Sequence, residues 1–232
     1  MRILGLIPAR GGSMGVPRKN IKLLGGIPLI NYTINSALNC PLLSDVIVST
    51  EDEEIAEISK KSGAKVSFIR PLELASNKAP SIDTIRHAIN FFIALDETYD
   101  AVCLLQPTVP FRDSNDIDKA ISIFSKNDSD SLISVQEIPH KFNPHWAFLE
   151  SSESDHLKLA TGGDQIISRR QDLPKAFFRD GSIYITKTQT ILEDNSLYGK
   201  NISYYHNKKD TINIDTLEDW ALAEKFISDN ER

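Results

Sequence analysis

The residues of this sequence best suited to chemistry lie between positions 10 and 20. Three cationic side chains and three glycines share this stretch: Arg10, Gly11, Gly12, Gly15, Arg18 and Lys19. Glycine permits backbone conformations in which successive amides converge on one anion, and guanidinium and ammonium groups neutralise phosphate charge. The pattern predicts a loop that holds a polyphosphate, and a surface turn with scattered basic residues is the alternative.

Two common nucleotide-binding motifs are absent from this loop. It contains neither GxGxxG nor GxxxxGK[ST], because Gly15 is followed by Val16, Pro17, Arg18 and Lys19. The loop is therefore neither a Rossmann fingerprint nor a Walker loop.

The elements that must position the loop follow an α/β pattern. Ile3, Leu4, Leu6 and Ile7 form an apolar run that predicts a first strand buried on both faces and ended by Pro8. Strands alternating with helices favour a mostly parallel sheet, and ligands of such sheets bind at the carboxyl ends of the strands. Further strands are predicted at 45–50, 66–69, 101–105, 131–135, 181–186 and 201–205, and helices at 30–38, 51–61, 82–95, 113–124 and 216–227.

Length and composition predict one domain in an ordinary soluble chain. The chain has 232 residues and a net charge of −6. Nucleic acids and membrane surfaces are negatively charged and bind proteins with a positive surface, so neither is expected as a partner. No apolar run approaches the roughly 20 residues that span a bilayer, and no signal-peptide pattern is found. Cys40 and Cys103 are expected to be reduced. We therefore expect a cytoplasmic protein.

The alternation of predicted strands and helices stops between residues 137 and 180. This segment is polar, contains Pro139, Pro144 and Pro174, and includes aromatic residues such as Phe142 and Trp146. It is too long for an ordinary connection. We expect a single domain over 1–232 with an arm or lid inserted at about 137–180, called the arm below.

Six stretches of the sequence form a recognisable set. They are IPARGGSMGVPRKN (7–20), VSTEDEEIA (48–56), RPLELA (70–75), LLQPTVPFR (104–112), RRQDLP (169–174) and INIDTLEDWALAE (212–224). In order and spacing they resemble the CMP-sialic acid synthetase family of nonulosonic acid cytidylyltransferases. The resemblance runs from about Arg2 to Phe226, and the first and fourth stretches together are its most specific part.

The resemblance implies a three-layer α/β/α nucleotidyltransferase fold and a homodimer in which each arm reaches the neighbour's sugar site. It implies that CTP and a 2-keto sugar acid are joined to a CMP-sugar, with release of pyrophosphate and with Mg²⁺ as cofactor. The anomeric hydroxyl would attack the α-phosphorus, so catalysis would rest on positioning and neutralisation of phosphate charge.

The resemblance also assigns roles to individual residues. For CTP, the phosphates and ribose would be bound by Arg10, Gly12, Ser13, Lys19 and Asn20, and cytosine by Arg70 and Ser81. Ser81 could instead be a plain helix cap, or serve both purposes. The sugar would meet Gln106, Arg170 and Tyr184, although Gln106 could be a structural amide and Tyr184 a core residue. Arg10, Lys19 and Asp215 are the candidate catalytic residues.

Several positions depart from the family pattern. Asn213 and Asp215 stand at the positions of the usual Asp-x-Asp metal ligands, so one negative charge is lost. Metal binding should therefore depend on Asp215 and the triphosphate. Met14 replaces a lysine of the phosphate loop, which predicts weaker phosphate binding unless Arg18 substitutes for it. No general base is evident, and deprotonation assisted by Asp215 or by the metal is a hypothesis.

The positions that the resemblance places near the sugar carry more aromatic residues here than in the N-acetylneuraminate enzymes. Trp146 stands where a basic sugar contact is usual, and Phe178 stands where arginine is usual, with Arg179 one place along. This favours a less polar acceptor such as a legionaminic or pseudaminic acid, unless these aromatics only pack a dimer interface. A 3-deoxy-octulosonate-type acceptor, or a catalytically impaired nucleotide-binding relative, are the alternatives.

Overall fold

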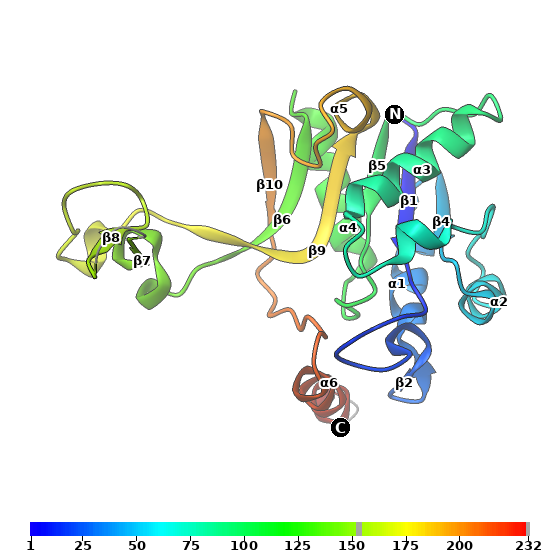
Figure 1. The fold of residues 1–232 in the computed structure, drawn as a ribbon, viewed down its shortest axis with the longest axis horizontal. Coiled ribbons are helices and arrows are strands. Elements are labelled where there is room, and N and C mark those ends of the chain that lie inside the picture. Colours follow the sequence, from blue (N-terminus) through cyan, green and yellow to red (C-terminus); the bar gives the residue numbers. More distant parts are fainter. Residues whose placement is uncertain (152–154, 231–232) are drawn as a thin grey trace.

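A six-stranded sheet forms the centre of the protein (Figure 1). The computed structural model describes residues 1–151 and 155–230. The strands of this sheet are β1 (Ile3–Pro8), β4 (Asp45–Ser49), β5 (Ala101–Leu104), β6 (Ser131–Glu137), β9 (Phe177–Lys187) and β10 (Ile202–His206). Their order is β10-β6-β9-β5-β1-β4, and only β9 runs antiparallel to its neighbours. The predicted mostly parallel sheet is confirmed.

Helices cover both faces of the sheet, which confirms the three-layer architecture. Ile34 and Phe124 belong to the core on the face covered by α1 and α4, and Ile89 and Ile191 belong to the core on the opposite face, under α3 and α5. None of the helices in the described part of the chain has the length and apolarity needed to cross a membrane. The helices are α1 (Leu29–Leu38), α2 (Glu53–Lys61), α3 (Ser81–Ile93), α4 (Ser114–Lys126), α5 (Thr188–Glu193) and α6 (Leu217–Asn230).

A third, smaller core joins the glycine-rich loop to the C-terminal helix. Val16 of the loop packs with Ile214 and with Trp220 of α6, and all three are buried. The hairpin of β2 (Leu23–Leu24) and β3 (Ile27–Pro28) adds to the same cluster. This packing fixes the loop against the segment that precedes α6.

Two local predictions are wrong. Residues 66–69 form no strand, because only Lys65 bridges to Ile47 at the sheet edge, and Phe68 then turns to pack against Phe91 of α3. Ser81 is not the N-cap of α3 but its first residue: Pro80 occupies the cap position, and no side chain caps the helix.

The arm projects away from the sheet on the side of β6 and β9 (Figure 1). The chain leaves the sheet at Glu137 and returns at Phe177, so both strands reach into the predicted arm. Residues 152–154 of the predicted arm lie outside the described residues. Between the two strands lie a hairpin of β7 (Phe148–Glu150) and β8 (Leu157–Leu159) and the short helices η3 (His140–Phe142), η4 (Pro144–Trp146) and η5 (Arg170–Asp172).

Candidate active site

A polar pocket of about 280 Å³ opens where β1 and β5 end. Both strands end at the same edge of the sheet because they are parallel, so the residues that follow them converge there. Residues from four separate stretches line it, namely 8–20, 70–84, 106–108 and Asp215. The predicted site residues among them are Arg10, Gly12, Ser13, Lys19, Asn20, Arg70, Ser81, Gln106 and Asp215.

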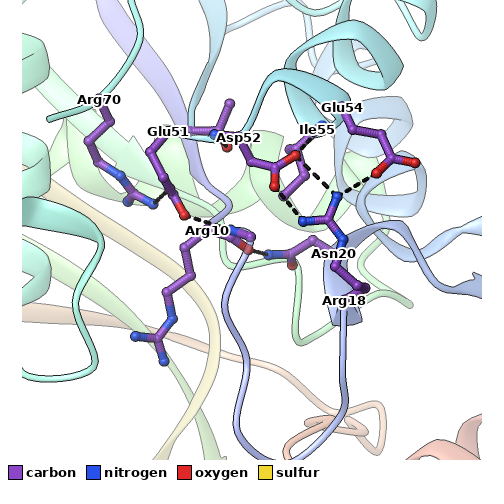
Figure 2. A network of polar contacts seen from close by, with 10 residues as sticks. Arg10, Arg18, Asn20, Glu51, Asp52, Glu54, Ile55 and Arg70 are labelled. Carbon is purple, nitrogen blue, oxygen red and sulfur yellow. Dashed lines mark hydrogen bonds and ion pairs between the residues drawn. The ribbon is translucent and has the colours of Figure 1, made fainter. Parts of the chain in front are cut away.

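The glycine-rich loop, residues 10–20, forms one wall of the pocket and is closed on itself. The Asn20 side-chain amide donates a hydrogen bond to the Arg10 carbonyl over 2.8 Å, so the two ends of the loop meet. The close-up view shows the Arg10 guanidinium turned away from the acidic residues beside the loop (Figure 2). Among the described residues no ion pair joins Arg10 to a carboxylate, which leaves its charge available to an anionic ligand.

Arg18 does not supply the positive charge that a lysine at position 14 would carry. Its guanidinium is bound by the carboxylates of Asp52 and Glu54, the latter over 2.6 Å (Figure 2). The hydrogen bond to Asp52 is the main cause that raises the pKa of Arg18, and the same bond lowers the pKa of Asp52. Met14 itself is 79% exposed. The loop therefore carries one cation fewer toward the pocket than the family pattern.

Arg70 is held in the opposite wall by Glu51, a residue for which the sequence predicted no role. The Arg70 side chain is 4% exposed, and its Nη2 donates to the Glu51 carboxylate over 2.8 Å. The Arg70 Nε atom is buried and has no hydrogen-bond partner in the described part of the chain. The place of Glu51 just after the predicted strand at 45–50 is the sequence signal that could have pointed to it, because ligands of such sheets bind at the carboxyl ends of strands.

The turn after β5 is fixed by a buried arginine. Arg112 donates to the Gln106 carbonyl over 3.1 Å and to the Ser182 carbonyl of β9 over 2.7 Å. Burial lowers the pKa of Arg112, yet arginine keeps its charge at neutral pH. Thr108 in this turn also lines the pocket, and its buried hydroxyl has no partner among the described residues. It is a second residue to which the sequence assigned no role.

Asp215 lies against the glycine-rich loop, just before α6. The Lys19 ammonium group is 3.2 Å from its carboxylate and 2.7 Å from the Ile214 carbonyl. The carboxylate of Asp219 accepts hydrogen bonds from the amides of Asp215 and Thr216, which lower the pKa of Asp219 and cap the helix start. Asp215 is thus held at a fixed place on the pocket wall.

Three predicted site residues do not line the pocket. Arg170 is exposed on η5 in the arm. Tyr184 is 6% exposed and packs in the core under α3. Asn213 lies beside the pocket and donates its amide to the Asp215 carboxylate over 2.7 Å. Asn213 and Asp215 are both exposed, and the buried Ile214 lies between them in the sequence.

The aromatic residues that the sequence placed near the sugar lie in and near the arm. The Trp146 indole donates to the Ile167 carbonyl over 2.5 Å, within the arm itself. Phe142 and Phe178 are exposed and line a separate hollow of about 750 Å³ at the base of the arm. Arg179 donates to the Tyr198 hydroxyl over 3.2 Å. None of these four residues lines the polar pocket.

Residues 4–230 match the sequence profile of the family described as Cytidylyltransferase. The chain belongs to the cytidylyltransferase family. Full-length relatives agree with this nucleotidyltransferase assignment. CMP-N,N'-diacetyllegionaminic acid synthase of Legionella pneumophila is 36% identical, over 100% of this chain and 98% of its own. Pseudaminic acid cytidylyltransferase of Campylobacter jejuni is 32% identical, over 96% and 95%.

Solved structures of cytidylyltransferases share the fold. CMP:2-keto-3-deoxy-manno-octonic acid synthetase complexed with CTP superposes with a TM-score of 0.75, at 15% identity, and covers 99% of this chain and 100% of its own. At this identity the likeness concerns the fold alone. The family assignment makes the polar pocket the candidate active site of a nucleotidyltransferase.

Proposed function

We propose that this cytidylyltransferase transfers CMP from CTP to the anomeric hydroxyl of a nonulosonic acid and releases pyrophosphate. The observation that carries the proposal is the convergence of the loop, Arg70, Gln106 and Asp215 on one pocket. The full-length relatives named for legionaminic and pseudaminic acids support the class of acceptor.

The phosphates of CTP would lie against the glycine-rich loop. Arg10 and Lys19 supply positive charge there, and Ser13 and the amide of Gly12 supply hydrogen-bond donors. The acceptor's hydroxyl oxygen forms a bond to the α-phosphorus as the bond to the pyrophosphate oxygen breaks. The site assists by aligning the two reactants and neutralising the leaving group.

The cytosine would lie against Arg70 and Ser81. Arg70 is fixed by its ion pair with Glu51 and keeps a buried Nε without a partner in the described part of the chain. Ser81 is exposed at the start of α3, and its hydroxyl caps no helix. Donors and acceptors held in fixed places are what the edge of a neutral base requires.

Mg²⁺ is the metal we propose for this site. Among residues 1–151 and 155–230 no three His, Cys, Asp or Glu side chains gather to hold a metal. One carboxylate on Asp215, aided by the amide oxygen of Asn213, still fits Mg²⁺, which protein sites hold with one or two carboxylates plus substrate phosphates. The bound ion would neutralise phosphate charge.

Asp215 is also the candidate to assist removal of the proton from the acceptor hydroxyl. Among the described residues that line the pocket it is the one with a carboxylate, and it lies against the glycine-rich loop. An Asp215→Asn variant is expected to lose most of its turnover. Full turnover of that variant would reject this role.

A homodimer would bring the arm to the acceptor site. Arg170 is exposed in the arm and does not line the pocket of its own chain. Phe142, Phe148 and Phe178 are exposed there too, and exposed aromatic clusters are typical of interfaces. Sedimentation should give a dimer. Mixed dimers of Arg170→Ala and Asp215→Asn subunits should recover activity that neither variant has alone.

The proposal is tested by pyrophosphate release from CTP and Mg²⁺ with four acids: legionaminate, pseudaminate, N-acetylneuraminate and a 3-deoxy-octulosonate. The aromatic arm favours one of the first two. Pyrophosphate release with the octulosonate alone would show that the acceptor is a 3-deoxy-octulosonate and not a nonulosonic acid. Release with none, while CTP still binds, would indicate a catalytically impaired relative.

A further inference from the structure

We infer that Glu51 is a positioning residue that couples the phosphate loop to Arg70, so that the two ends of the nucleotide are recognised as one unit. The inference rests on the proposed function, in which Arg70 faces the base and the loop holds the phosphates. Glu51 itself would touch neither the base nor the phosphates.

The two oxygens of the Glu51 carboxylate serve different walls of the pocket (Figure 2). Oε1 accepts a hydrogen bond from the Gly11 amide over 2.7 Å, and Oε2 accepts one from Arg70 Nη2 over 2.8 Å. Gly11 and Arg70 lie on either side of Glu51 in the sequence, and this one side chain joins them. One carboxylate thus links the position of the loop to the position of Arg70.

The sheet fixes the place from which Glu51 reaches out. β4 pairs in parallel with β1, with Pro8 opposite Ser49, and the two strands end together. The Ala9 amide donates to the Ser49 carbonyl over 2.9 Å, and the Arg70 amide donates to the Thr50 carbonyl over 2.8 Å. The backbone therefore brings the loop, Glu51 and Arg70 within reach of one another before any ligand binds.

Burial makes this contact important for the geometry of the site. The side chains of Arg70 and Glu51 are 4% and 11% exposed. A buried charge that loses its partner is strongly destabilised, because water cannot replace the lost interaction. In the described part of the chain the Arg70 guanidinium has one other side-chain hydrogen-bond partner, the Thr84 hydroxyl at 3.5 Å. Glu51 therefore holds the guanidinium in the orientation that faces the base.

The loop leaves no space for an alternative arrangement at this point. A Cβ atom on Gly11 would lie 3.2 Å from the Asp52 Cβ and closer still to its carboxylate, so the loop backbone packs directly on the turn after β4. Asp52 holds Arg18 on the outer side of this turn, whereas Glu51 faces the pocket wall (Figure 2). The neighbouring acidic residues thus offer a matched comparison.

The test compares Glu51→Gln with Asp52→Asn by calorimetric titration of the full chain with CTP, UTP and tripolyphosphate. A glutamine offers one oxygen and one NH2 group, and that NH2 group, itself a donor, would face either the Gly11 amide or the Arg70 guanidinium. One of the two hydrogen bonds is therefore lost in the present geometry. We expect Glu51→Gln to weaken CTP binding about tenfold, to reduce the preference for CTP over UTP, and to weaken tripolyphosphate binding as well. Asp52→Asn should keep the preference for CTP.

The preference for CTP over UTP is the readout that a general loss of structure would not change. If Glu51→Gln weakens CTP and UTP equally, the coupling role is overturned. If the variant does not fold, Glu51→Asp, which keeps the charge but is too short to reach both partners, is titrated instead, and an unchanged preference overturns the role. A wild-type protein that binds no CTP overturns the proposed function, and this inference with it.

Discussion

The ammonium group of Lys19 lies 3.2 Å from the carboxylate of Asp215, across 196 positions of the sequence. The Lys19 side chain is 11% exposed, whereas that of Asp215 is 63% exposed. Lys19 therefore joins the glycine-rich loop to the acidic residue proposed to hold the metal. A ligand that brings both phosphate and Mg²⁺ would give each of the two side chains a new partner of opposite charge.

Replacing Lys19 should remove transition-state stabilisation. For Lys19→Met we expect kcat/KM to fall about a hundredfold, because a positive charge near the leaving pyrophosphate is lost. Lys19→Arg should retain part of the activity. Lys126→Met, which changes an exposed lysine at the end of α4, is the control and should match the wild type. Equal activity of Lys19→Met and the control would contradict the role.

Restoring the second carboxylate should strengthen metal binding. Asn213 now donates to Asp215, and Asn213→Asp would replace that donor with a second negative charge on the same exposed face. The Mg²⁺ concentration for half-maximal pyrophosphate release should fall several-fold. An unchanged Mg²⁺ titration would show that residue 213 takes no part in holding the metal.

Adding a cation to the loop should improve binding of the triphosphate. Met14 is exposed, and Arg18 is engaged by Asp52 and Glu54. We expect Met14→Lys to lower the KM for CTP several-fold, with a smaller effect on binding of CMP, which lacks the β- and γ-phosphates. If affinities for both nucleotides stay as in the wild type, residue 14 does not face the phosphates.

Gly15 should tolerate no side chain. A Cβ atom there would lie 1.9 Å from the Asp215 carbonyl oxygen, so Gly15→Ala must displace the segment that carries Asp215. We expect activity to fall about a hundredfold, as misplaced catalytic groups commonly cause. The control for stability is Gly12→Ala, where nothing lies within 4 Å of the added atom, so its Tm should equal that of the wild type. Full activity of Gly15→Ala would contradict the close approach.

The ion pair of Asp52 with Arg18 should make stability depend on pH. Arg18 lowers the pKa of Asp52, so the pairing stabilises the fold above the unfolded value near 3.9 and is lost as pH falls through the folded pKa. Asp52→Asn keeps the cap on the Ile55 amide but loses the charge. At pH 7 the variant should be less stable by about 0.5–1 kcal/mol, since Arg18 is partly exposed. Urea unfolding should show this difference shrinking toward about pH 2, and a difference constant with pH would contradict the pairing.

The sequence by itself determined the layers, most of the elements and most of the pocket. Apolar runs such as residues 101–105 predict buried strands because both of their faces must leave water, and glycines beside arginine and lysine favour phosphate binding. The loop could be named from its residue types, and Arg70 and Gln106 could be named from the resemblance of their stretches to the family; the pocket brings them together.

The tertiary structure decided what depends on pairs of distant residues. Residues 66–69 read as a strand, but whether an apolar run joins a sheet depends on the neighbouring edge, and only Lys65 bridges to Ile47. The bond between Glu51 and the Gly11 amide, and the diversion of Arg18 to Asp52, follow from the parallel register of β1 and β4. No local pattern encodes that register, because it arises only when the strands pack into one sheet.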